Sequence, residues 1–178
     1  MFLGIDRHPS GALALKDNED YMLTYGELVK EVKSFCPDIK TGAVVFQLCK
    51  NTVGSMVGYL SFVERGVVPL MLSSKIDSEL LESLLGTYTP TYLWVPTEEV
   101  EKFHFKVLYS NFGYTLLETG NELYPINDKL QLLMTTSGST GSPKLVRYKK
   151  GNLEANAKNV AIAFEWSSVE RPVWLRIF

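Results

Sequence analysis

The sequence predicts a layered α/β domain whose sheet is mainly parallel. Strand-like and helix-like segments alternate along the chain, and most strand-like segments are almost wholly apolar, as in a parallel sheet covered on both faces. The chain has 178 residues, the length of about one domain. With 46% hydrophobic residues, it is expected to bury roughly 70% of its unfolded surface, so its core needs neither disulfide nor metal. We therefore predict one three-layer domain over residues 1–178, with right-handed crossovers between parallel strands.

The first predicted helix spans residues 24–35. Thr24 and Glu27 match a capping box at its start. Its apolar residues recur on one face: Leu28, Val29, Val32 and Phe35. A buried-type strand follows at residues 43–48, because the run AVVFQL is almost wholly apolar.

A second helix follows this strand and begins at Asn51 or Thr52, either of which can cap it. An apolar stripe predicts its inward face: Met56, Tyr59, Leu60 and Val63. The helix is expected to stop at Gly66, directly before another apolar strand at residues 67–72.

The same alternation of strand and helix continues. A third helix is predicted to begin at Asp77, its cap, and to stop at Gly86. A third strand is predicted at residues 91–95. The acidic residues at the start of residues 97–103 indicate a short helix there, because negative charge is favourable in a first helical turn.

The last third of the chain contains strands and one helix. Residues 106–118 are strand-like with a turn near Asn111–Gly113, so they form either a hairpin or two separate edge strands. A buried-type strand is predicted at residues 130–135 and a further strand at residues 144–148, followed by a helix over residues 152–166. Five residues of this helix are expected to face inward: Leu153, Ala157, Val160, Ala161 and Phe164.

Charge and composition exclude several classes of protein. A net charge of -2 argues against nucleic acid as the principal partner. Cys36 and Cys49 are expected to be buried, reduced thiols, and His8 and His104 belong to no metal-binding pattern. Residues 1–20 lack the pattern of an export signal, and no apolar stretch approaches the ~20 residues that span a bilayer. We therefore expect a soluble, cytoplasmic protein without a membrane span.

The run TTSGSTGSPK, residues 135–144, directly follows a buried-type strand and has the composition of a phosphate-binding loop. Gly138 and Gly141 can adopt positive φ, which lets successive N–H groups converge on phosphate oxygens. Three hydroxyl side chains add donors without bulk: Ser137, Ser139 and Thr140. Lys144 supplies a positive charge opposite polyphosphate.

Other interpretations of this run are weaker. A Walker-type loop ends in Gly-Lys-Ser/Thr, and a dinucleotide fingerprint has GxGxxG spacing, and neither pattern is present. A flexible surface loop is the plain alternative. The ordered alternation of hydroxyls and glycines, the terminal Pro-Lys and the adjoining strand favour phosphate binding.

The segment LLMTTSGSTGSPKLV resembles the phosphate-binding signature of the adenylate-forming (AMP-binding) superfamily. This superfamily contains acyl-CoA synthetases, nonribosomal-peptide adenylation domains and firefly-type luciferases. Val146 and the pair Asn152–Leu153 stand in register with the family pattern, whereas Lys149 and Lys150 occupy the positions of its hydroxyl-histidine pair. Residues 23–28 and 42–72 resemble upstream family segments, so the resemblance covers most of the chain and implies a Rossmann-like N-terminal subdomain.

The resemblance implies a reaction in which a carboxylate attacks the α-phosphate of ATP, with Mg²⁺, to give an acyl-adenylate and pyrophosphate. The residues implied to hold the β- and γ-phosphates are Thr136, Ser137, Gly138, Ser139, Thr140, Gly141 and Lys144. Donors and a lysine directed at the departing pyrophosphate stabilise developing charge and position the nucleotide. The partners implied for the full-length family are ATP and a carboxylic acid.

Family enzymes are several times longer, and their motifs for adenine, magnesium, ribose and the C-terminal lysine are not found here. We therefore expect residues 1–178 to be a single N-terminal subdomain of an AMP-forming acid ligase, truncated after the phosphate-loop helix and inactive alone. Catalytic residues stay unassigned and no metal ligands are predicted. One alternative is a noncatalytic interaction or oligomerisation module that docks to the missing subdomains or to a second copy. An unrelated phosphotransferase is disfavoured, because no acidic pair with magnesium spacing accompanies the loop.

Overall fold

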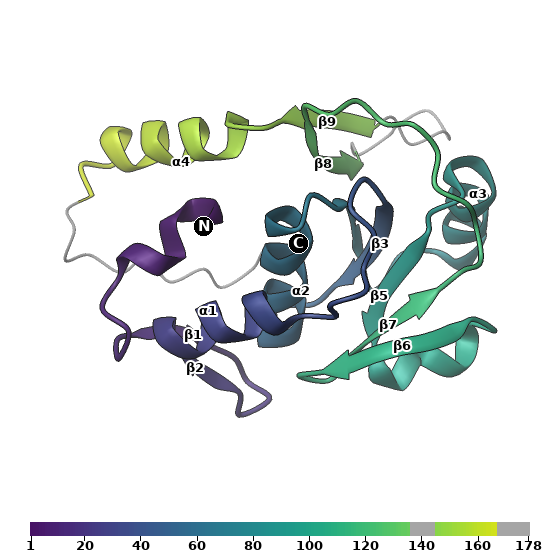
Figure 1. Cartoon of the computed structure of the whole chain (residues 1–178), viewed down its shortest axis with the longest axis horizontal. Coiled ribbons are helices and arrows are strands. Elements are labelled where there is room, and N and C mark those ends of the chain that lie inside the picture. Colours follow the sequence, from purple (N-terminus) through teal and green to yellow (C-terminus); the bar gives the residue numbers. More distant parts are fainter. Residues whose placement is uncertain (136–144, 167–178) are drawn as a thin grey trace.

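A seven-stranded sheet forms the centre of the molecule (Figure 1). The structure is a computed structural model that describes residues 1–135 and 145–166. The strand order is β6-β7-β5-β3-β4-β8-β9. These strands are β3 (Val44–Cys49), β4 (Val68–Ser73), β5 (Tyr92–Pro96), β6 (Lys106–Asn111), β7 (Tyr114–Glu118), β8 (Leu130–Thr135) and β9 (Leu145–Lys149). A separate two-stranded sheet consists of β1 (Leu13–Lys16) and β2 (Met22–Thr24).

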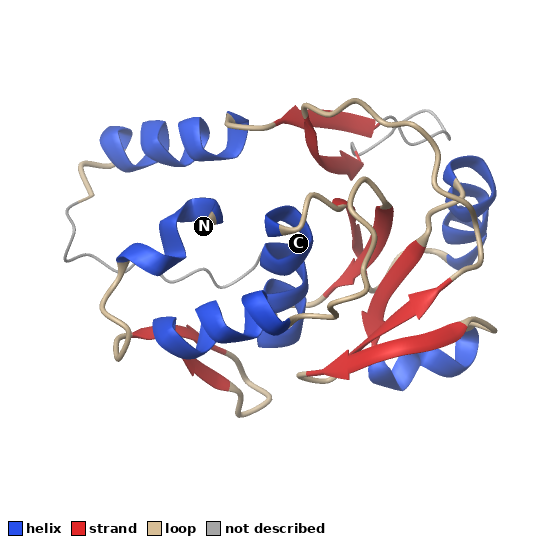
Figure 2. Cartoon of the chain, in the orientation of Figure 1, coloured by secondary structure: helices blue, strands red, loops and turns tan. Residues whose placement is uncertain are grey.

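Four α-helices and two 3₁₀ helices accompany the strands in the described part of the chain (Figure 2). They are η1 (Phe2–Arg7), α1 (Tyr25–Ser34), α2 (Val53–Glu64), α3 (Ser78–Tyr88), η2 (Thr97–Lys102) and α4 (Asn152–Ala163). The capping box predicted at the start of α1 is confirmed, since Thr24 and Glu27 bond each other's backbone N–H reciprocally.

The centre of the sheet is parallel and both of its edges are antiparallel. Strands β5, β3, β4 and β8 run parallel to one another. The β6–β7 hairpin adds to β5 in the antiparallel sense, and β9 adds to β8 in the same way. Residues 106–118 thus form a hairpin rather than two separate edge strands, with a turn at Phe112–Gly113, where φ is positive. The predicted fold class is confirmed.

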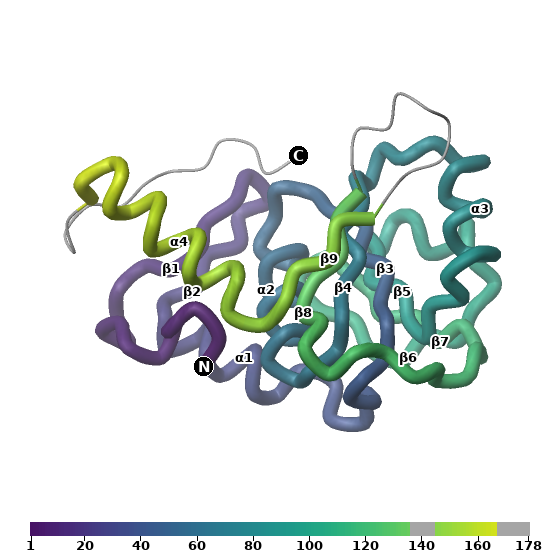
Figure 3. Tube along the Cα trace, turned by 90° about the horizontal axis from the view of Figure 1, so that it is seen from above, coloured from purple at the N-terminus to yellow at the C-terminus, as the bar shows by residue number. Residues whose placement is uncertain are grey.

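Helices cover both faces of the sheet, which gives the predicted three layers. Figure 3 shows α1 and α2 on one side of the central strands and α3 on the other. Alternate residues of each central strand therefore enter different cores. On β3, Val45 packs in the α1–α2 core, whereas Phe46 packs in the core beneath α3.

Trp94 lies at the centre of the larger core and is fully buried. Its indole N–H donates to the carbonyl of Gly54 in α2 at 3.0 Å. Its ring lies between 5.2 and 6.3 Å from four other aromatic rings: Phe35, Phe62, Tyr109 and Tyr114.

Two glycines let α2 approach the sheet this closely. A Cβ placed on Gly58 would overlap the indole of Trp94, and one placed on Gly54 would overlap the carbonyl of Phe112. Because the two glycines are four residues apart, they lie on the same face of α2. Larger residues at either position would push the helix away from β5 and the β6–β7 turn.

The apolar stripe predicted on α2 contacts the core, since Leu60 is buried and Tyr59 and Val63 pack against it, but it is not the most buried side of the helix. Only Leu60 of the predicted stripe is buried, whereas Met56, Tyr59 and Val63 are half-buried. The buried side includes the two glycines together with Val53, Ser55, Val57, Ser61 and Phe62. Because the sheet, α1 and η1 all contact α2, the helix is covered on more than one side, and its apolar stripe does not mark the closest contact.

Two helix predictions in the outer parts of the chain also need correction. Helix α3 begins at Asp77 as predicted, but it continues past Gly86 to Tyr88, and Thr89 takes the left-handed position at its end with φ 36°. Helix α4 ends at Ala163 and buries none of its residues. Ala157 and Phe164, which were expected to face inward, are exposed.

The cysteine prediction agrees with the structure, because Cys36 and Cys49 are both buried free thiols. Among the described residues, no helix has the length and apolarity that crossing a membrane requires.

Candidate functional site

The residues predicted to bind phosphate lie outside the described part of the chain. They are Thr136, Ser137, Gly138, Ser139, Thr140, Gly141 and Lys144. Their role stays a prediction. The described residues on either side nevertheless fix where this segment begins and ends.

Thr135 and Leu145 flank the predicted loop and are cross-strand partners. Thr135 ends β8, Leu145 begins β9, and the two are paired in the antiparallel ladder. The ladder continues through Met134 paired with Val146 and Leu133 paired with Arg147. The segment between them therefore leaves and re-enters the sheet at one place, the carboxyl end of β8.

This place lies at the edge of the sheet where ligands bind in doubly wound α/β proteins. Strand β8 is parallel to β4, and β4 to β3, so the carboxyl ends of all three lie at one edge. The chain passes from β3 into α2 on one face and from β4 into α3 on the other. The connections after β3 and β4 thus leave toward opposite faces of the sheet. The space between the carboxyl ends of these two strands is the usual position of a ligand crevice in such sheets, and it lies one strand away from β8.

The N-terminus of α2 at this edge is already occupied by a carboxylate of the chain. Asp17 Oδ2 accepts a hydrogen bond from the Val53 N–H at 2.7 Å. Asp17 Oδ1 accepts from Glu19 and Tyr21, at 2.9 and 3.1 Å, which holds the connection between β1 and β2 in place. Since anions and carboxylates compete for free N–H groups at a helix N-terminus, Asp17 takes the position that a phosphate would use there.

Sequence reasoning missed Asp17 and expected Asn51 or Thr52 to cap α2. Thr52 is the N-cap residue, but its side chain accepts no capping hydrogen bond. Asp17 lies 36 residues before Val53 in the sequence. Capping patterns are read within about four residues, so no local signal indicates this contact.

The lysine that follows β3 is also engaged by the chain. The Lys50 ammonium forms an ion pair with Glu98 of η2. The hydrogen bond between these groups raises the pKa of Lys50 and lowers the pKa of Glu98. Lys50 is therefore a poor candidate for a phosphate-binding cation.

A buried polar network supports the carboxyl end of β3. The Tyr114 hydroxyl donates to the Leu48 carbonyl at 2.9 Å and accepts from the Lys50 N–H at 2.9 Å. The Gln47 amide donates to the Ser55 carbonyl at 2.7 Å. Burial raises the pKa of the Cys49 thiol to about 12, so this cysteine is not an activated nucleophile.

The basic residues that follow the predicted loop in the sequence are on the outer surface. The side chains of Arg147, Lys149, Lys150 and Lys158 are all exposed. Two of them lie on β9, whose first residue adjoins the predicted loop. Among residues 1–135 and 145–166, no group of three or more His, Cys, Asp or Glu side chains is placed to hold a metal ion.

The fold and the position of the loop define a doubly wound α/β protein with its candidate ligand edge at β8. The sequence profile of the AMP-binding enzymes matches residues 4–177, and the chain belongs to that family.

Solved structures of adenylate-forming enzymes have the same fold. The o-succinylbenzoate-CoA synthetase MenE of Bacillus subtilis superimposes with a TM-score of 0.71 at 20% identity, covering 94% of this chain and 36% of MenE. E. coli MenE gives 0.61 at 23% identity, covering 86% of this chain and 34% of that one. MatB from Rhodopseudomonas palustris gives 0.69 at 16% identity, covering 89% and 36%. No curated protein matches the chain.

The chain is much shorter than these structures. It spans between 34% and 50% of the length of the solved structures compared with it. At these identities the superpositions establish the fold, and the activities of the longer proteins are matters for proposal.

Proposed function

We propose that this chain provides the ATP phosphate-binding part of an AMP-forming acid ligase, which joins a carboxylate to the α-phosphate of ATP and releases pyrophosphate. The proposal rests on the pairing of Thr135 with Leu145, which puts both ends of the hydroxyl- and glycine-rich loop at the carboxyl edge of the sheet. Membership of the AMP-binding family supports the same reaction class.

In this proposal the loop acts as a set of hydrogen-bond donors for the β- and γ-phosphates. Gly138 and Gly141 supply approachable N–H groups, and Lys144 supplies charge. The hydroxyls of Thr136, Ser137, Ser139 and Thr140 complete the set. Donors aimed at the leaving pyrophosphate stabilise the charge that develops on it and orient the nucleotide for attack.

Asp17 and Glu98 explain why the loop, and not α2 or Lys50, takes this role. Each carboxylate engages one donor at this edge, the Val53 N–H of α2 in one case and the Lys50 ammonium in the other. Phosphate is therefore directed to β8.

ATP would arrive as its magnesium complex, and the donor set of the loop suits phosphate oxygens rather than the metal itself. Bacillus subtilis MenE has been solved with ATP and a magnesium ion. When bound, Mg²⁺ neutralises phosphate charge.

We further propose that residues 1–178 alone bind ATP weakly and do not complete adenylation. Phosphate contacts without those to adenine and ribose must offset an association cost of about 4–15 kcal/mol. The chain spans at most half of the solved structures compared with it.

Calorimetric titration of the 178-residue chain with ATP and with AMP tests the phosphate-binding role. ATP should bind at least about tenfold more tightly than AMP, because AMP lacks the β- and γ-phosphates, and Lys144→Ala should remove most of that difference. The matched control is Lys40→Ala, an exposed lysine that precedes the amino end of β3. Equal affinities for ATP and AMP, or an unchanged difference in Lys144→Ala, would contradict the proposal.

Exchange of labelled pyrophosphate into ATP tests the reaction. The chain alone should give none above background with any carboxylic acid. Exchange at enzymatic rates by these 178 residues would show that they suffice for adenylation.

A noncatalytic interaction module is the second candidate function. The observation that favours it is the exposure of Ile162 (65%) and Phe164 (68%) at the end of α4. Sedimentation distinguishes it, because a clean monomer at high concentration argues against self-association.

A further inference from the structure

A pocket of about 320 Å³ lies on the α3 side of the sheet, where the end of α3 approaches β8 and β9. On this side, β8 and β9 are covered in part by the connection between β7 and β8, which contributes Tyr124 and Ile126 to the lining. An irregular connection fills the space above a sheet less completely than a packed helix does. A hollow is therefore left beside α3.

The lining of this pocket is almost wholly apolar. Val44, Leu130 and Leu133 line it and also belong to the core beneath α3. Tyr88 and Tyr124 line it as well, and the Tyr124 hydroxyl donates to the Tyr88 carbonyl at 2.8 Å, so this hydroxyl is satisfied within the chain. Apolar concave pockets of this size with few polar groups are typical of small-molecule sites.

Arg147 of β9 is the charged residue in the lining. It is the cross-strand partner of Leu133, so the two side chains lie on the same face of the sheet. The Arg147 side chain is exposed, and a ligand can therefore reach its guanidinium. Among residues 1–135 and 145–166, no carboxylate forms an ion pair with Arg147, and no Asp or Glu lines the pocket. The charge of this pocket thus favours an anion.

The pocket extends away from the predicted phosphate loop. Val44 and Leu130 are the first residues of β3 and β8, and Tyr88 is the last residue of α3. Arg147 lies two residues beyond Leu145, which corresponds to about 7 Å along a strand. The pocket therefore reaches from the end of the loop toward the amino edge of the sheet, and its occupant is distinct from the nucleotide.

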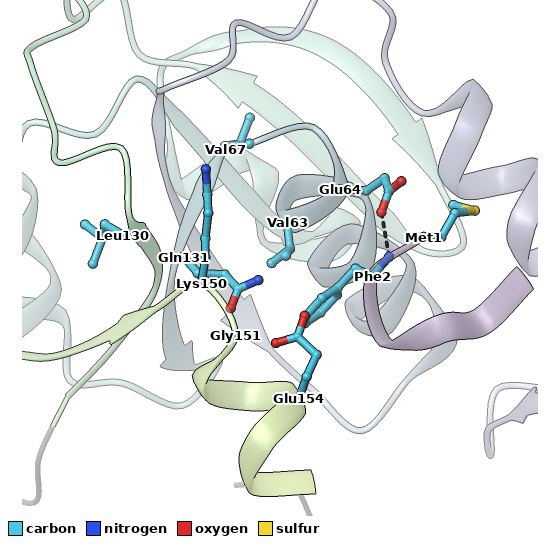
Figure 4. Close-up of a pocket in the computed structure, with 11 residues that line it drawn as sticks. Met1, Phe2, Val63, Glu64, Val67, Leu130, Gln131, Lys150, Gly151 and Glu154 are labelled. Atoms are coloured by element: carbon cyan, nitrogen blue, oxygen red, sulfur yellow. Dashed lines mark hydrogen bonds between the residues drawn. The ribbon is translucent and has the colours of Figure 1, made fainter. Parts of the chain in front are cut away.

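A larger pocket of about 460 Å³, beside η1, the end of α2 and the first turn of α4, does not select one sign of charge (Figure 4). Glu64, Lys150 and Glu154 all line it. The Glu64 carboxylate is already engaged, because it accepts from the Phe2 N–H at 2.7 Å. Only the pocket beside α3 combines an apolar lining with a single accessible charge among the two pockets compared.

We propose that the pocket between α3 and β9 binds a monocarboxylate with a short apolar chain, whose carboxylate pairs with the Arg147 guanidinium. The planar guanidinium matches a carboxylate with two parallel N–H donors, and a single cation balances a single negative charge. The apolar chain lies against Leu133 and Ile126. The same chemistry is presented by a free alkyl carboxylate and by the C-terminus of an apolar peptide.

Titration of the 178-residue chain with octanoate, followed by NMR, tests the proposal. Octanoate should bind at least about tenfold more tightly than 1-octanol or n-octylammonium, which have the same apolar chain with a neutral or a positive head. Arg147→Met keeps much of the apolar stem and should remove most of this preference. Lys149→Met is the matched control, because Lys149 is an exposed cation on the same strand that does not line the pocket. It should change the preference by less than about twofold.

Two further measurements do not depend on a loss of binding, which a variant that fails to fold would also show. Arg147→Glu should reverse the preference, so that n-octylammonium binds more tightly than octanoate. In the unsubstituted protein, nuclear Overhauser effects should connect the octanoate methylenes to the methyl groups of Leu133 and Ile126. Octanoate binding no tighter than that of octanol, an unchanged preference in Arg147→Met, or contacts elsewhere on the surface would each overturn the proposal.

Acetyl-leucyl-leucine with a free carboxylate distinguishes the two sources of the ligand. Tighter binding of this peptide than of octanoate assigns the pocket to a peptide C-terminus, and weaker binding assigns it to a free acid.

Discussion

The centre of the sheet and its β9 edge differ in how completely their apolar residues are covered. Every residue of β3 is buried, and helices close both of its faces. On the other side of β8, helix α4 has no buried residue, and Val146 of β9 is 39% exposed. Stability should therefore reside in the α1–α2–α3 part of the molecule, whereas β8 and β9 flank the candidate phosphate loop. A rigid scaffold beside a lightly packed, functional edge is the arrangement that binding loops generally require.

The largest difference in stability between the two regions should come from truncating one aromatic side chain in each. Trp94→Ala should lower the free energy of unfolding by about 3–5 kcal/mol, because the indole is fully buried and its N–H bonds Gly54. Phe164→Ala should change it by less than about 0.5 kcal/mol, because that ring is 68% exposed. Urea denaturation followed by far-ultraviolet circular dichroism measures both. Comparable losses in the two variants would show that the β9 edge is as tightly packed as the centre.

Two glycines in helices give the next largest contrast. Gly58→Ala should destabilise the protein by about 1–3 kcal/mol, because the new methyl group overlaps the buried indole of Trp94. Gly86→Ala should stabilise it by about 0.5–1 kcal/mol, since a Cβ there meets nothing within 4 Å and alanine is the better helix former. Thermal unfolding of both variants is the measurement. The close approach of α2 to β5 would be disproved if Gly58→Ala were neutral.

Removing the carboxylate at the start of α2 should have a smaller effect. Asp17→Ala leaves the Val53 N–H without its partner and should lower the free energy of unfolding by about 1–2 kcal/mol. Asp128→Ala, an exposed aspartate, is the control and should be close to neutral. If Asp17 also keeps anions away from α2, sulfate should stabilise the Asp17→Ala variant more than the unsubstituted protein. An equal response to sulfate in both proteins would contradict that competition.

The sequence predicted the covered region better than the edge, for physical reasons. Strand β3 is recognisable because burial on both faces requires a continuous apolar run. The period of α4 shows which residues share a face, but it does not show whether anything covers that face, so Phe164 was assigned inward wrongly. The phosphate loop has a local composition that indicates its chemistry, whereas Asp17 bonds the start of α2 across the fold and carries no local signal. The contacts of the loop residues themselves stay a prediction.

The smallest effect concerns how the first helix of each region begins. Helix α1 starts with a capping box in which Glu27 accepts from the Thr24 N–H at 2.8 Å, whereas α4 follows Gly151, which makes no side-chain cap. The hydrogen bonds from Thr24 lower the pKa of Glu27 below its ordinary value of 4.5. Because the folded-state pKa is depressed, the charge of Glu27 stabilises the protein above pH 4.5, and this contribution is lost as the pH falls through the folded-state pKa.

Glu27→Gln keeps the hydrogen-bonding shape and removes the charge. Its urea midpoint should therefore lie slightly below that of the unsubstituted protein at pH 7 and should approach it at about pH 3. Glu82→Gln, on the exposed side of α3, is the control and should show no such convergence. A difference that stays constant across this pH range would mean that the charge of Glu27 does not stabilise α1.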